Sequence, residues 1–320
     1  MNTDGLIEIL SWARPHDSET EQRFCREFLD TVPGMQKDAF GNRMCRIGTD
    51  KVLWSCHVDT VAKRGGPQAV SLDADGIASL AAGKPGMSLG ADDGAGVWIM
   101  LSMIAAGRPG LYVFHRGEEV GCLGSAWIVE NTPELLTGID AAVAFDRAGH
   151  RDIITHQISG RTCSDAFAQS FADELSLLGG GLLAYRPDDG GVYTDTNEYA
   201  HIIPECSNVS VGYRGQHGPR ETLDVVHCAR LLNAMLNFDF AKMKIERDPT
   251  APDRHDFDWH RTPKRRADKL EDYASVIETY PYVAAQLLTR LGVSLDDFVD
   301  ETWGDGAPWE DHHYKPLVPS

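Results

Sequence analysis

The sequence lacks long apolar runs and paired cysteines. No apolar stretch reaches 18 residues, about the length that spans a bilayer core, and the first residues lack the basic start and apolar run of a secretory signal. The seven cysteines are an odd number, are scattered and form no CxxC pair. We therefore expect reduced thiols in a soluble protein of the cytoplasm, with no membrane partner.

Basic residues are also scarce. The chain has 30 Lys and Arg against 48 Asp and Glu, which gives a formal net charge of -18. Such a charge disfavours nucleic acid and anionic membranes as partners, because both carry the same sign. A solvated acidic surface explains most of the excess, and acidic metal ligands explain part of it.

The pattern of apolar segments predicts one large α/β domain. At 320 residues and 42% hydrophobic composition, the chain can bury a sizeable core without disulfides or other cross-links. Short apolar runs alternate with amphipathic segments, which predicts a three-layer α/β/α sandwich with a mixed, mostly parallel central sheet. The expected strands are 52–56, 111–115, 141–145 and 209–213, with a hairpin at 69–77, and the expected helices are 4–13, 17–31, 97–106, 123–131, 164–178 and 225–238.

A change of composition divides the chain near residue 240. Residues 1–240 hold the α/β pattern, whereas residues 241–320 begin with a charged linker and end in an acidic, aromatic segment. We expect short helices around 270–279 and 282–291, so that 241–320 forms a small, charged, helical C-terminal extension. No recognisable chemistry lies in it.

Acidic residues and histidines follow the predicted strands. The carboxyl ends of parallel strands meet at one edge of a sheet, where α/β enzymes place their sites. We therefore expect these side chains to gather there: His57, Asp59, Asp92, Glu118, Glu119, Asp146 and His217.

This set meets the requirements of a two-metal hydrolytic site. Such a site needs a bridging carboxylate, terminal histidine and carboxylate ligands, and a free carboxylate that accepts a proton from water. We assign His57 and Asp146 to one metal, His217 and Glu119 to the other, and Asp92 to the bridge.

The two remaining acids have separate expected roles. Glu118 precedes a ligand in the sequence and so points elsewhere, which leaves it free as the general base. Asp59 lies two residues after His57 in an extended segment, and we expect its carboxylate to hydrogen-bond the far nitrogen of that imidazole.

Each motif alone has a simpler explanation. His57 and Asp59 resemble an ordinary core pair, Asp92 resembles a helix cap, and Glu118 with Glu119 resembles a solvated turn. Asp146 resembles an ordinary Asp at the end of a strand, and His217 resembles a surface histidine. Five such coincidences in this order are improbable together, so the metal interpretation is favoured.

At these motifs the chain resembles the co-catalytic dizinc exopeptidases, which include zinc aminopeptidases, the glutamate-carboxypeptidase type and peptidase T. The resemblance covers roughly residues 50–235 and rests on SCHVD at 55–59, LGADDGAG at 89–96, GEEVGCLGS at 117–125, AFD at 144–146 and HGPRET at 217–222. It implies a cis peptide between Asp92 and Asp93.

The chain differs from many carboxypeptidase-type members in one respect. Only 70 residues separate Asp146 from His217, too few for the additional lid or dimerisation domain that those members insert there. The chain therefore looks like a lidless, aminopeptidase-like member, whose local loops must recognise the end of the substrate.

Several residues near the expected ligands are candidates for that recognition. Asp195 could bind a free amine, and Arg147 or Arg161 could bind a carboxylate; the sequence leaves both open. The substrate-binding candidates are Arg147, Asp165, Asp195, Asn197, Tyr213 and Gln216.

These observations predict a hydrolase with two zinc ions, for which cobalt or manganese are substitutes. It would cleave a terminal amide bond of a small peptide or acylated amino acid. Aminopeptidase is favoured, with carboxypeptidase and N-acyl amino acid deacylase as alternatives. A catalytically inactive metal- or protein-binding module is the alternative of another class, and a homo-oligomer stays open.

Overall fold

The computed structural model describes residues 3–81 and 88–251. The chain divides into two compact units, Met1–His255 and Asp256–Ser320, and all described residues belong to the first. The helices expected at 270–279 and 282–291 lie outside the described residues. The boundary expected near residue 240 stays a prediction.

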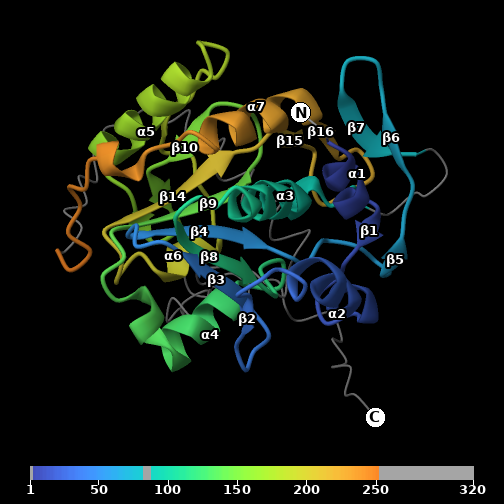
Figure 1. Ribbon diagram of the computed structural model, residues 1–320, viewed down its shortest axis with the longest axis horizontal. Coiled ribbons are helices and arrows are strands. Elements are labelled where there is room, and N and C mark those ends of the chain that lie inside the picture. Colours follow the sequence, from blue (N-terminus) through green and yellow to red (C-terminus); the bar gives the residue numbers. More distant parts are fainter. Residues whose placement is uncertain (1–2, 82–87, 252–320) are drawn as a thin grey trace, which may run out of the picture. The chain divides into compact units, whose positions relative to one another are not determined.

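The centre of the first unit is a mixed, eight-stranded sheet (Figure 1), which agrees with the predicted fold class. Its middle strands β14, β9, β4 and β8 are parallel, and antiparallel neighbours flank them on both sides. In spatial order the strands are β13 (Arg186–Asp188), β10 (Asp152–Ile154), β14 (Glu205–Ser210), β9 (Ala141–Arg147), β4 (Val52–His57), β8 (Gly110–His115), β3 (Arg43–Ile47) and β2 (Gln36–Lys37).

Helices cover both faces of this sheet. Figure 1 shows α5 and α7 on one side of the central strands and α4 on the other. The helices are α1 (Asp4–Leu10), α2 (Glu19–Phe24) with a π-helical turn at Cys25–Leu29, α3 (Ala91–Ala105), α4 (Leu123–Asn131), α5 (Asp165–Leu178), α6 (Asp195–Glu198) and α7 (Val225–Met235), with 3-10 turns at Pro133–Leu136 and Phe240–Lys242.

Two hydrophobic cores result, one on each face. Successive side chains of a strand point to opposite faces, so Trp54 and Cys56 join the core beneath α1, α3, α5 and α7, whereas Leu53 joins the core beneath α4. Every residue of β4 is buried, as its apolar run predicts. These two cores make the three layers of the sandwich.

A smaller sheet stands beside the large one. It is antiparallel and has the order β15 (Tyr213–Arg214), β16 (Thr222–Asp224), β7 (Ile77–Leu80) and β6 (Val70–Leu72). The hairpin expected at 69–77 is the β6–β7 pair. Two further strand pairs are β1 (Trp12–Ala13) with β5 (Gly66–Pro67), and β11 (His156–Gln157) with β12 (Gly160–Arg161).

The structure changes two expected elements. The first helix ends at Leu10, and the chain then enters β1 instead of continuing to residue 13. The strand expected at 209–213 is the end of β14 and the start of β15, and β14 itself begins at Glu205. Within the described ranges, no helix has both the length and the apolar character needed to cross a membrane.

Candidate metal centre

Three parallel strands and two loops bring the candidate residues together. His57 is the last residue of β4, and its register partner His115 ends β8 just before Glu118 and Glu119. Asp146 lies near the end of the neighbouring strand β9. Since these ends share one edge of the sheet, the expected clustering follows from the strand order.

The remaining two side chains reach this edge from outside the sheet. Asp92 stands at the start of α3, and His217 lies on the loop between β15 and β16. The peptide between Asp92 and Asp93 is cis, as the family resemblance implies.

Asp92 stands between the two histidines. Its Oδ1 lies 3.0 Å from His57 Nε2, and its Oδ2 lies 3.1 Å from His217 Nε2. Glu119 Oε2 is 3.1 Å from the same nitrogen of His217, and Asp146 Oδ1 is 3.6 Å from His57 Nε2. The five side chains therefore form two groups that share one carboxylate.

These separations suit a pair of bound cations. Donor atoms 2.0–2.2 Å from a tetrahedral zinc ion lie about 3.3–3.6 Å from one another. His57 Nδ1 lies 2.9 Å from the backbone carbonyl of Asp59, which fixes the ring and turns Nε2 toward the carboxylates. Glu119 Oε1 is buried without a hydrogen-bond partner. A bound cation would accept the lone pairs of His57 Nε2 and Glu119 Oε1, so the residues present fit a metal.

The balance of charge leads to the same conclusion. Five mostly buried carboxylates, those of Asp92, Asp93, Glu118, Glu119 and Asp146, surround two imidazoles. Burial together with the negative charge of Asp92 raises the pKa of Glu119 to about 7, although His217 acts in the opposite direction. The cluster therefore lacks positive charge.

The pKa values of the two histidines are raised as well. Burial alone would lower the pKa of His57, but the Asp146 and Asp92 carboxylates outweigh it and raise the pKa well above its usual value. In the same way, burial is outweighed by Asp92 and Glu119 at His217, whose pKa rises to about 12. Without a metal, both imidazoles would be held as cations.

Glu118 faces the cluster without belonging to either group. Its Oε2 is 3.9 Å from His57 Nε2, and the thiol of Cys122 lies 3.6 Å from its Oε1. Burial raises the pKa of Glu118 well above its usual value, and the Asp146 carboxylate adds to this while His57 opposes it. Oε2 of Glu118 thus faces the metal-binding atoms, whereas its Oε1 contacts the Cys122 thiol.

The Asp59 carboxylate does not make the contact expected for it. It lies 3.8 Å from His57 Nδ1, which instead meets the Asp59 backbone carbonyl. Its oxygens accept hydrogen bonds from the backbone N–H groups of Gly117 (2.8 Å), Glu118 (3.2 Å) and Glu119 (3.2 Å). Asp59 therefore holds the loop that carries Glu118 and Glu119.

The structure brings some of the substrate-binding candidates to the site. The Tyr213 hydroxyl donates to Asp146 Oδ1 (3.1 Å), and the exposed Gln216 precedes His217. Arg147 contacts Asp152 and the Gly190 carbonyl beside the end of β9.

Other candidates lie elsewhere. Asp195 is 1% exposed and accepts a hydrogen bond from Ser125, so it lies beneath the site rather than at its rim. Asn197 accepts from Ser159. Asp165 begins α5, next to Ser164, which is bonded to Glu205 at the amino end of β14. The edge that holds Asp146 is about 16 Å away along the strands, so Asp165 does not reach the site.

Several residues near the ligands were not expected from the sequence. Thr194 donates to Asp146 Oδ2 at 2.7 Å, and Asp93 accepts from the backbone N–H of His57 at 3.2 Å. Glu221 accepts from the backbone N–H groups of Gly90 and Asp92. Asp93 and Glu221 both lie inside the motifs that predicted the site. Their closeness in sequence to Asp92 and His217 is the feature from which a role near the ligands could have been predicted.

A third group of possible ligands already has other partners. His16, Glu21 and Asp59 could together approach a metal ion. Arg116 binds Glu21 through two hydrogen bonds of 2.8 and 2.7 Å, and Asp59 is occupied by the three backbone N–H groups. We assign no metal to this group.

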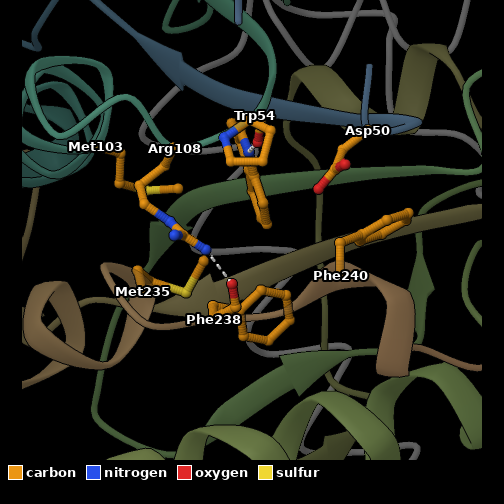
Figure 2. A pocket seen from close by; sticks show the side chains of 8 residues that line it. Asp50, Trp54, Met103, Arg108, Met235, Phe238 and Phe240 are labelled. Carbon is orange, nitrogen blue, oxygen red and sulfur yellow. Dashed lines mark hydrogen bonds between the residues drawn. The ribbon is translucent and has the colours of Figure 1, made fainter. Parts of the chain in front are cut away.

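A small pocket at the opposite edge of the sheet is no substrate site (Figure 2). It lies beside the amino ends of β4 and β8, and its volume of about 10 Å³ suits one water molecule. Arg108, which lines it, donates to the Phe238 carbonyl. The lining residues are Asp50, Trp54, Met103, Arg108, Pro109, Met235, Phe238 and Phe240.

Comparison with known proteins agrees with this geometry. Residues 42–195 match the family model described as peptidase family M28, and this range contains all the candidate ligands except His217. Over this range the chain is similar to peptidases of family M28, which agrees with the resemblance of its motifs. No curated protein matches the sequence significantly.

Solved structures share the fold of this chain. Aminopeptidase PepT from Bacillus cereus ATCC 10987 is 14% identical, with a TM-score of 0.57 over 73% of this chain and 96% of that chain. A tripeptidase from Staphylococcus aureus subsp. aureus Mu50 is 14% identical, with a TM-score of 0.59 over 73% and 95%. PhTET1-12s, described as a dodecamer, is 16% identical, with a TM-score of 0.52 over 75% and 100%.

Proposed function

We propose that the chain is a two-metal aminopeptidase that removes the first residue of a small peptide. His57 and Asp146 would hold one metal, His217 and Glu119 would hold the other, and the Asp92 carboxylate would be shared by the two groups. The placement of Asp92 carries this proposal, because its two oxygens lie 3.0 and 3.1 Å from the Nε2 atoms of different histidines. Zinc is the proposed metal, with cobalt or manganese as substitutes.

Two metal ions bound there would polarise the substrate carbonyl and lower the pKa of water toward neutrality. Glu118 takes the proton from the attacking water at Oε2 and later delivers it to the leaving amine. Tyr213 and Thr194 hold the two oxygens of Asp146, and Asp59 holds the loop of Glu118. These residues keep the base and the ligands in place before substrate arrives.

The test combines elemental analysis with a panel of dipeptides that are free or blocked at each end. We expect two metals per chain and cleavage only of substrates with a free amine. Cleavage that requires a free carboxylate with a blocked amine would replace aminopeptidase by carboxypeptidase or deacylase. A chain that binds no metal after zinc is added back would contradict the two-metal centre.

Substitution of the base separates an enzyme from an inactive binding module. Glu118→Gln should lower kcat by about 10²–10⁴-fold with both metals retained, because the amide cannot accept a proton. Glu174→Gln is the matched control, since Glu174 on α5 is also mostly buried but accepts a hydrogen bond from Lys242 in the 3-10 turn that follows α7. Equal activity of the two variants would contradict the role of Glu118.

A homo-oligomer also belongs to this proposal. The shared fold with PhTET1-12s, described as a dodecamer, supports it. Size-exclusion chromatography with light scattering measures the state directly.

A further inference from the structure

Glu221 is a buried carboxylate for which the proposed mechanism has no use. It stands four residues after His217, immediately before β16, and is 1% exposed. Its Oε2 accepts a hydrogen bond from the backbone N–H of Gly90 at 3.0 Å, and its Oε1 accepts one from the backbone N–H of Asp92 at 3.0 Å. Both oxygens therefore bind the segment that presents the bridging Asp92.

This segment needs such an acceptor. The N–H groups that begin a helix have no partner within the helix, and those of Gly90 and Asp92 lie at the start of α3. Gly90 has a φ of +71°, and a Cβ atom there would lie 2.9 Å from Thr60, so the turn is closely confined. Glu221 fixes the turn from the side of the small sheet.

The same contact joins the two halves of the site. Asp92 is carried by α3 on the large sheet, whereas His217 and Glu221 belong to the loop between β15 and β16 of the small sheet. Glu221 thus connects the segments whose side chains meet at Asp92 Oδ2 and His217 Nε2, 3.1 Å apart. A shift between the sheets would separate these two atoms.

We propose that Glu221 is a positioning residue that sets the affinity of the metal held by His217, by tying its loop to the backbone of Asp92. This inference rests on the proposed two-metal function. The residue does not touch the metal or the substrate. Its role is to hold the second group of ligands at binding distance from the bridge.

The test is zinc titration of the metal-free protein in competition with a chromophoric chelator, which requires no activity. Glu221→Gln keeps the shape of the side chain but has one acceptor oxygen, so its NH₂ group faces a backbone N–H. We expect one tight zinc site to remain and the second to weaken about 10–100-fold, the usual effect of losing a partner that orients a ligand. His217→Ala marks complete loss of the second site.

Glu205→Gln is the matched control. Glu205 is fully buried and accepts from the backbone N–H groups of Ser164, Glu246 and Arg247, but it lies at the opposite edge of the sheet. We expect this variant to lose stability and still bind two zinc ions as the wild type does. A general effect of removing a buried carboxylate would instead weaken zinc binding in both variants, and would overturn the inference.

The outcomes also separate this inference from the proposed function. If the wild type binds two zinc ions and Glu221→Gln shows the same isotherm, the positioning role is refuted and the two-metal enzyme stands. If the wild type binds fewer than two, both fail. Should Glu221→Gln not fold, Glu221→Asp replaces it: a second-site affinity between the wild type and His217→Ala supports the role, and wild-type affinity overturns it.

Discussion

At the scale of single residues, Asp59 shows how one side chain can serve the base through the backbone. Asp59→Asn retains the shape but leaves one of three buried N–H groups facing an NH₂, a cost of about 1–3 kcal/mol. We expect faster amide hydrogen exchange at 117–119 and a kcat about 10–100-fold lower, with KM little changed. Exchange measured by mass spectrometry or NMR, together with steady-state kinetics, checks both.

Asp38→Asn is the control for this change. Asp38 also accepts from two backbone N–H groups, those of Gly41 and Asn42, but it lies in the turn before β3. It should leave exchange at 117–119 and kcat unaltered. Unaltered exchange at 117–119 in Asp59→Asn would mean that Asp59 does not hold the loop.

The sequence located Asp59 but not its contact. An extended His-x-Asp segment places both side chains on one side, and this favoured a bond to the imidazole. In the fold, the loop after β8 passes beneath Asp59 and supplies three N–H groups. This contact depends on the pairing of β4 with β8, which no local pattern reveals.

At the scale of elements, helix α3 can approach the sheet only where its residues are small. A Cβ atom on Gly96 would lie 2.5 Å from Asp93 Oδ2 and 2.7 Å from the Phe145 carbonyl. We expect Gly96→Ala to push the helix from β9 and to lower the free energy of unfolding by about 1–3 kcal/mol. Urea denaturation followed by tryptophan fluorescence measures it.

Gly5→Ala offers the opposite case in another helix. A Cβ atom there meets Trp98 at 3.7 Å or more, which is ordinary contact. Alanine in α1 should therefore stabilise the protein by about 0.4–1 kcal/mol, because the unfolded chain loses freedom. A destabilisation equal to that of Gly96→Ala would show that helical glycines are needed for a reason other than space.

Strand β14 shows why some elements escape prediction. All six of its residues are buried, yet Glu205, Ser207, Asn208 and Ser210 are polar. Each has found a partner in the fold, such as the Asp146 backbone for Asn208 and the Ile154 carbonyl for Ser207. A periodicity argument assigns such residues to a loop, so only Val209 and Ser210 were expected in a strand.

The misplacement of Asp165 has a related cause, since the start of a helix does not reveal which edge of the sheet it faces.

At the scale of the whole molecule, the sandwich was predictable because its central strands are apolar runs that stop at polar residues. Strands β4, β8 and β9 agree with the expected 52–56, 111–115 and 141–145 to within two residues. The polar residues at the ends of these strands also predicted the candidate ligands, because the carboxyl ends of parallel strands lie together at one edge of the sheet. The motifs also predicted how the ligands divide into two groups. The packing of the small sheet, which brings His217 to within 3.1 Å of Asp92, is not visible in any sequence pattern.

The excess of carboxylates should govern the stability of the metal-free protein. Burial raises the pKa of Glu119 and of Glu221 to about 7, and each carboxyl stabilises the fold below its unfolded value of 4.5 and loses this effect as pH rises through 7. The raised pKa of His217 acts in the same direction, since its contribution is complete below 6.5 and fades toward 12. The lowered pKa of Asp92 stabilises the fold fully above its unfolded value of 3.8, and this contribution is lost only as pH falls below that value.

Between pH 5 and pH 8, therefore, the chelator-treated protein should lose stability as pH rises. Each kcal/mol lost lowers Tm by about 2–4 °C for a domain of this size. Added zinc should raise Tm most at pH 8, because its ligands are then deprotonated and binding to the folded state adds to stability. Differential scanning calorimetry with and without zinc measures this, and Glu119→Gln should flatten the slope of the metal-free protein. A metal-free Tm that rises from pH 5 to pH 8 would show that the cluster balances its charge without a cation, and would remove the electrostatic argument for the metal.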